Sequence, residues 1–162
     1  MKVKTLILGI GNLLLSDEGF GVHFVRHLEG HYLFPEDVEI FDGGTLGLMA
    51  THKYEAAERV YLVDTLAIDG EPGECRRYGK DQLLHGKLPV KLSPHQAGVQ
   101  EMMMVSELRG CGPPEVTLLG VIPASFESSI ELTPPLQERL HLLAGELVEE
   151  LRSSGHAVEE IE

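Results

Sequence analysis

The sequence lacks several features that mark secreted, disulfide-rich and membrane-spanning proteins. It has no tryptophan, only 6% aromatic residues, and two cysteines, Cys75 and Cys111, with no CxxC pair. A chain of 162 residues can bury a core without disulfides, so we expect two reduced thiols. No run approaches the ~20 apolar residues that span a bilayer, which argues against a transmembrane segment.

The N-terminal run does not have the pattern of a secretory signal peptide. Lys2 and Lys4 precede apolar residues, but Gly9 and Gly11 interrupt them, and Glu18 follows without a small-x-small cleavage site. We therefore expect this run to be the first core strand of a cytoplasmic protein.

Basic residues are also scarce. Thirteen Lys and Arg stand against 26 Asp and Glu, which gives a net charge of −13. Phosphate backbones and anionic lipids repel such a surface. We therefore expect no nucleic acid and no membrane as partners, whereas a protein or peptide with a basic patch stays possible.

What the sequence does contain is an alternation of short apolar runs and amphipathic stretches. Strands are expected at residues 3–8, 38–41, 60–63, 73–78 and 116–122. Helices are expected at about 17–32 (capped by Ser16 or Asp17), 45–54 (capped by Thr45), 99–108 and 134–155, and an extended segment at 87–94. This order predicts one α/β domain over residues 1–162, with a twisted, mostly parallel β-sheet, helices on both faces, and frayed residues 158–162.

Polar side chains follow the ends of the expected parallel strands. Glu18 follows the first strand, Asp42 ends the second and Asp64 ends the third, while His95 lies between an extended segment and a helix. Ligands of open α/β sheets bind outside the carboxyl ends of the strands, so we expect these residues at one edge.

Gathered carboxylates repel one another, and a cation relieves that repulsion. Two carboxylates and an imidazole suit nickel, zinc, manganese or iron, and three protein ligands leave open positions for a reaction. The alternative is that Glu18 is a first-turn helix acid, Asp64 a turn former and His95 a loop histidine. The residues alone leave both readings open.

Other sites fit the sequence less well. Gly9-x-Gly11 resembles the start of a dinucleotide fingerprint, but Leu14 replaces the third glycine and acidic residues follow. No P-loop and no GxSxG motif occurs. His23, His27 and His31 share one helix face, yet Phe24 follows His23 and HExxH is absent, so we expect a solvated face.

Five motifs in order resemble those of the hydrogenase maturation protease family, from about residue 3 to residue 150. They are Gly9-Ile10-Gly11-Asn12 with Asp17-Glu18-Gly19-x-Gly21, Asp42-Gly43-Gly44-Thr45, Val63-Asp64, Ser93-Pro94-His95-Gln96 and Gly120-Val121-Ile122-Pro123. Each motif alone is weak, but together they are specific.

The resemblance implies an endopeptidase that removes a C-terminal extension from the large-subunit precursor of a [NiFe] hydrogenase after nickel insertion. It implies metal contacts by Glu18, Asp64 and His95, with nickel supplied by the substrate or another divalent metal in its place. We expect a monomer, because the protein must embrace a larger partner.

The mechanism stays open between two versions. In the first, the metal assists hydrolysis and Asp42, Glu18 or Asp64 acts as general base. In the second, the metal only docks the substrate and a carboxylate pair does aspartic-type chemistry. A non-catalytic, metal-dependent chaperone of the large subunit, or a metallohydrolase acting on another peptide, is the alternative function.

Overall fold

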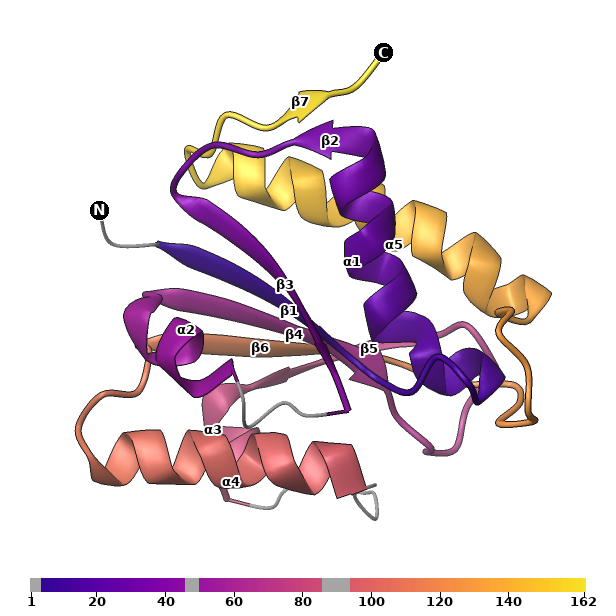
Figure 1. Cartoon of the computed structure of the whole chain (residues 1–162), viewed down its shortest axis with the longest axis horizontal. Coiled ribbons are helices and arrows are strands. Elements are labelled where there is room, and N and C mark those ends of the chain that lie inside the picture. Colours follow the sequence, from indigo (N-terminus) through magenta and orange to yellow (C-terminus); the bar gives the residue numbers. More distant parts are fainter. Residues whose placement is uncertain (1–3, 46–49, 86–93) are drawn as a thin grey trace.

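The computed structural model describes residues 4–45, 50–85 and 94–162, which form helices around a central sheet (Figure 1). The strands are β1 (Thr5–Ile10), β2 (Tyr32–Leu33), β3 (Val38–Gly44), β4 (Arg59–Thr65), β5 (Cys75–Gly79), β6 (Glu115–Val121) and β7 (Glu159–Glu160). The helices are the 3-10 helix η1 (Ser16–Gly19), α1 (Phe20–His31), α2 (Thr51–Ala56), α3 (Lys80–Leu84), α4 (Pro94–Leu108) and α5 (Pro134–Ser153).

The main sheet has the strand order β3-β1-β4-β6-β5. Strands β3, β1, β4 and β6 pair in parallel, and β5 pairs with β6 antiparallel at one edge. All six residues of β1 are buried, as expected of a strand covered on both faces. The predicted α/β fold with a mostly parallel sheet is confirmed.

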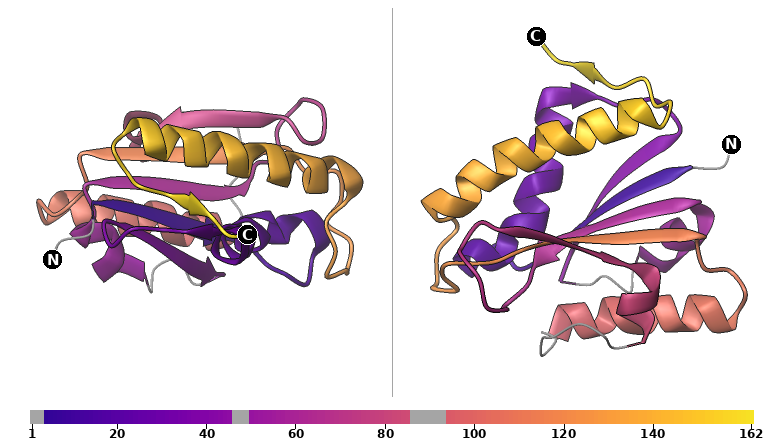
Figure 2. Two further views of the ribbon diagram at one scale, coloured as in Figure 1. Left: turned by 90° about the horizontal axis from the view of Figure 1, so that it is seen from above. Right: turned by 180° about the vertical axis from the view of Figure 1, so that it is seen from behind.

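Two apolar layers cover the sheet (Figures 1 and 2). Helices α1 and α5 lie over one face, where they pack on side chains such as Ile7 and Val63. Helices α2 and α4 lie over the other face, where they pack on Leu8 and Leu62. Consecutive strand residues therefore pack into different layers. The same alternation determines on which face of the sheet the side chain at the end of a strand lies.

The starts of two helices differ from the prediction, and one of them is α4, which begins at Pro94 instead of residue 99. Helix α1 begins at Phe20, not after a cap at Ser16 or Asp17, because both of these side chains bind a distant loop. Helix α2 begins at Thr51; residues 46–49 of the predicted helix lie outside the described residues, as do residues 87–93 of the predicted extended segment.

The chain end is ordered where fraying is expected from the sequence. Glu159 and Glu160 of β7 pair antiparallel with Leu33 and Tyr32 of β2, and Val158 is buried in the α1–α5 layer. This burial of Val158 holds the C-terminal segment against the core. Within the described ranges, no helix combines the length and apolarity that crossing a bilayer requires.

Candidate functional site

The carboxyl ends of β1, β3 and β4 lie side by side at one edge of the sheet. The register pairs Gly9 of β1 with Asp42 of β3 and with Val63 of β4. The chain leaves β1 through Gly11, whose N–H donates to the Gly44 carbonyl at 2.9 Å, and then enters η1. This route brings Glu18 back to the edge where β4 ends.

Two glycines allow α1 to start directly on this edge. A Cβ on Gly21 would overlap the carbonyl oxygens of Val63 and Ile10, and a Cβ on Gly9 would overlap the carbonyl of Gly21. The first turn of α1 therefore touches the backbone of β1 and β4, closer than any side chain would permit. Glu18 stands one turn before Gly21, and its side chain is half-buried.

Asp64 is the buried carboxylate of this edge. Its side chain is 1% exposed, and its Oδ1 accepts the N–H of Thr65 at 2.8 Å. Burial of a charged group in an apolar layer is costly unless the charge is compensated. Asp64 is therefore a candidate contact for a cation at this edge of the sheet.

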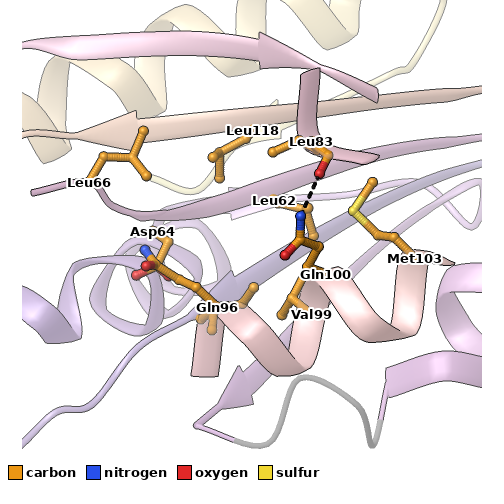
Figure 3. Close-up of a pocket in the computed structure, with 10 residues that line it drawn as sticks. Leu62, Asp64, Leu66, Leu83, Gln96, Val99, Gln100, Met103 and Leu118 are labelled. Atoms are coloured by element: carbon orange, nitrogen blue, oxygen red, sulfur yellow. Dashed lines mark hydrogen bonds between the residues drawn. The ribbon is translucent and has the colours of Figure 1, made fainter. Parts of the chain in front are cut away.

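Helix α4 begins beside the end of β4. The Nε2 of Gln96 donates to the Thr65 carbonyl at 2.6 Å, and Gln96 and Asp64 lie next to each other in Figure 3. The backbone of His95, one residue before Gln96, therefore lies near Asp64. The His95 side chain lies outside the described part of the structure.

The structure separates Asp42 from Asp64. Asp42 is in register with Gly9 and Val63, so its side chain points to the α1 face, whereas Asp64 is the next residue after Val63 and points to the α4 face. The Asp42 carboxylate accepts the Gly44 N–H at 2.9 Å and lies 3.5 Å from Arg26 of α1. The two acids thus share an edge, as expected, but not a face.

Sequence reasoning missed the role of Asp17. This carboxylate is completely buried and accepts four hydrogen bonds from the segment before α5. They come from Ala124 N (2.8 Å), Ser125 N (3.1 Å), Thr133 N (2.8 Å) and Thr133 Oγ1 (2.7 Å). Asp17 therefore fixes the backbone of Glu18, its neighbour, to a loop more than a hundred residues away.

Two of the three histidines on the predicted solvated face, half-buried His27 and exposed His31, form a ring cluster with His141 of α5. His27 stacks on His31 at a centroid distance of 4.0 Å and meets His141 of α5 edge-on at 4.9 Å. Burial, and then the charges of His31 and His141, lower the pKa of His27 to about 4. The His27 ring is therefore neutral at pH 7.

No three histidine, cysteine or acidic side chains among those that the structure describes are placed to hold a metal ion. The His95 side chain is not one of those described, so the predicted set of Glu18, Asp64 and His95 stays a prediction.

Comparison with known proteins decides the family. Residues 22–150 match the model of a family described as hydrogenase maturation protease. The chain belongs to this family. The resemblance seen in the motifs is thereby confirmed, and membership makes the chain a protease, a hydrolase of peptide bonds.

The sequence and the fold of known relatives are similar to this chain over most of its length. The hydrogenase 2 maturation protease of Escherichia coli is 33% identical over 153 residues, which cover 94% of this chain and 93% of the relative. The hydrogenase expression/formation protein HupD of Bradyrhizobium diazoefficiens is 36% identical, with 85% and 72% covered. The solved structure of the hydrogenase maturating endopeptidase HybD from E. coli superposes with a TM-score of 0.89 at 32% identity, covering 97% of both chains.

Proposed function

We propose that this member of the family is an endopeptidase that removes the C-terminal extension of a [NiFe] hydrogenase large-subunit precursor after nickel insertion. The observation that carries the proposal is the near full-length match to the hydrogenase 2 maturation protease of E. coli. The meeting of η1, the end of β4 and the start of α4 at one edge supports it, because such an edge is where open α/β sheets bind ligands.

The nickel of the precursor is, in this proposal, part of the substrate. Glu18, Asp64 and His95 would contact it and so report whether the precursor is loaded. The buried Asp64 and the half-buried Glu18 fit a divalent cation, since the positive charge favours the ionised form of both carboxylates. Two oxygens and one imidazole nitrogen also suit nickel or another divalent metal.

The bound metal would polarise the scissile carbonyl or acidify a water molecule. The residues of this chain would position the peptide and move the proton. Asp42 is the weakest candidate for the general base, because it lies on the other face of the sheet from Asp64 and beside Arg26. We assign this role to Glu18 or Asp64.

The test is a cleavage assay on a purified large-subunit precursor, with and without nickel, followed by intact mass. We expect loss of the C-terminal peptide only from the nickel-loaded form, and at least a hundredfold slower cleavage by Glu18→Gln, Asp64→Asn and His95→Ala. Glu29→Gln, at an exposed position of α1, is the matched control and should cleave normally.

Binding of the precursor separates the two mechanisms. If Glu18→Gln no longer binds the loaded precursor, the metal contact serves docking. If binding persists while cleavage is lost, Glu18 takes part in the chemistry. A wild-type protein that binds every loaded precursor and cleaves none would instead be the metal-dependent chaperone.

A further inference from the structure

Three large apolar side chains are exposed beside the turn that bears Glu18. Leu14 is 67% exposed just before η1, and Phe126 and Ile130 are 44% and 70% exposed in the segment between β6 and α5, which is orange in Figure 1. Single exposed apolar residues are common on protein surfaces, whereas a group of them marks an interaction site. We call these three residues the loop patch.

Backbone hydrogen bonds join the two segments that carry the loop patch. Leu15 and Ser129 form a parallel β-bridge. The Ser129 N–H donates to the Leu14 carbonyl at 3.1 Å, and the Ser16 N–H donates to the Ser129 carbonyl at 2.8 Å. Leu14 and Ile130 each adjoin a bridged residue, so their side chains lie on one short stretch of the surface although they are far apart in the sequence.

The conformation of this surface is fixed from several sides. Ser16 has a φ of 48°, in the left-handed region that serine rarely adopts, and its buried Oγ donates to the Glu131 carbonyl at 2.8 Å. Asp17 binds the same segment, and His23 of α1 forms a hydrogen bond with the backbone of Ile130. A strained backbone persists only where such contacts over-determine it. The loop patch is therefore held in place before any partner binds, which lowers the entropy lost on association.

Charge decides between the partners that such a patch could bind. Residues 11–20 and 121–137 contain no Lys, Arg or His, and Glu127 and Glu131 are exposed beside Phe126 and Ile130. Two copies of this chain joined through the loop patch would bring these acids together, and an anionic lipid surface would meet them as well, so both partners are repelled. The complementary partner is a protein whose apolar surface is rimmed by Lys or Arg.

We propose that the loop patch docks the hydrogenase large-subunit precursor, through an apolar surface of the precursor that is rimmed by Lys and Arg. The inference rests on the proposed function, which requires the precursor to reach Glu18. Glu18 follows Leu14 closely in the chain, and Asp17 ties their turn to the segment that carries the rest of the patch. A precursor seated on the loop patch is therefore held next to Glu18 by contacts outside the peptide that is cut.

The first experiment places a charge in the contact. We expect Leu14→Glu and Ile130→Glu each to raise Kd and KM for the nickel-loaded precursor roughly tenfold or more, and to leave kcat unchanged, because the patch touches no reacting atom. Leu108→Glu is the matched control. Leu108 is 87% exposed at the C-terminal end of α4, away from the edge where that helix begins, so Kd and KM should not change. Thermal unfolding checks that all three variants fold.

The second experiment tests the acidic rim. Exposed carboxylates that face Lys or Arg on a partner speed association, and salt screens this effect. The double variant Glu127→Gln/Glu131→Gln should therefore bind the loaded precursor with a lower association rate constant, and with a weaker dependence of that rate on salt. Glu29→Gln removes an exposed acid farther along α1 and should change neither quantity.

The outcomes separate the docking surface from the proposed function. Normal cleavage by the wild type, with unchanged Kd and KM in Leu14→Glu and Ile130→Glu, overturns the docking surface and leaves the proposed function standing. So does a wild-type dimer, or binding to phosphatidylglycerol vesicles, that Ile130→Glu abolishes while precursor binding persists. If the wild type binds loaded precursors but cleaves none, the proposed function fails and the change in Kd alone decides the patch. A wild type that binds no loaded precursor overturns both.

Discussion

Asp17 and Glu18 are adjacent acids in very different surroundings. Asp17 is completely buried and saturated by four donors from the segment before α5, whereas Glu18 is half-buried at the edge of the sheet. Hydrogen bonds to a charged group contribute about 1.5–3 kcal/mol each, so the Asp17 carboxylate is a strong fixed point. Its neighbour Glu18 gains a defined backbone position from it.

Replacement of this carboxylate by an amide tests its contribution to folding. Asp17→Asn puts an NH₂ group against at least one N–H donor, and we expect a loss of about 2 kcal/mol or more in the free energy of unfolding, measured with urea. Asp42→Asn is the matched control. It keeps an acceptor for the Gly44 N–H and weakens only a partly exposed pair with Arg26, so about 1 kcal/mol or less is expected. Equal losses in the two variants would contradict the role given to Asp17.

The sequence predicts only an N-cap role for Ser16 or Asp17, and the structure gives Asp17 another role. A Ser-Asp pair before an apolar helix is the usual signature of an N-cap, and a local pattern contains no information on a partner 116 residues away. The face of the sheet that Asp42 occupies could not be predicted for a similar reason. The end of a strand is readable from the sequence, whereas its face depends on the register with neighbouring strands, which only the assembled sheet defines.

At the scale of elements, the contact between α1 and the sheet depends on glycine. Gly21 lies against the carbonyls of Val63 and Ile10, and this contact sets where η1 and Glu18 lie. The motif Asp17-Glu18-Gly19-x-Gly21 therefore combines two functions in five residues. The acids give the charge, and the last glycine lets the helix approach the strands.

A methyl group at this contact is expected to be costly. Gly21→Ala should lower the free energy of unfolding by about 3 kcal/mol, because the added carbon overlaps backbone atoms that belong to two strands. Gly30→Ala, in the same helix but with nothing within 4 Å of the added carbon, should raise it by about 0.5–1 kcal/mol through helix propensity. Thermal or urea unfolding measures both, and a tolerated Gly21→Ala would show that the helix can move off the sheet.

Element types were readable from the sequence because each depends on a local pattern. The five strands of the main sheet and the long helices overlap the apolar runs and amphipathic periods that predict them, although α4 begins at Pro94 instead of residue 99. The ordered C-terminus was not readable, since Glu159 and Glu160 have no strand propensity of their own. Two contacts hold them beside β2. Val158 is buried in the core, and the Ile161 N–H donates a hydrogen bond to the His31 carbonyl.

At the scale of the whole molecule, α1 and α5 meet over one face of the sheet through a histidine cluster. His27 is in contact with His31 of its own helix and His141 of α5, and its pKa is lowered to about 4 from 6.5. Between these two values the unfolded chain binds a proton that the folded protein does not. Stability therefore falls as the pH drops from about 6.5 towards 4.

Removal of the His27 imidazole should make the stability of the protein depend less on pH. Between pH 7 and pH 5 we expect His27→Gln to lose less stability than the wild-type protein by about 1 kcal/mol, a value reduced for solvent screening because the rings are partly exposed. Chemical denaturation at the two pH values measures it. His52→Gln, at an exposed position of α2, should behave as the wild type does.

The reach of Asp17 also matters while the chain is being synthesised. Its donors follow 107 to 116 positions later, and a ribosome adds about 5–20 residues per second, so the carboxylate emerges on the order of ten seconds before them. During that interval the Asp17 carboxylate is hydrated by water, and the turn that bears Glu18 lacks one of its native anchors. A nascent chain thus cannot form this anchor beside Glu18 until residues 124–133 have been added.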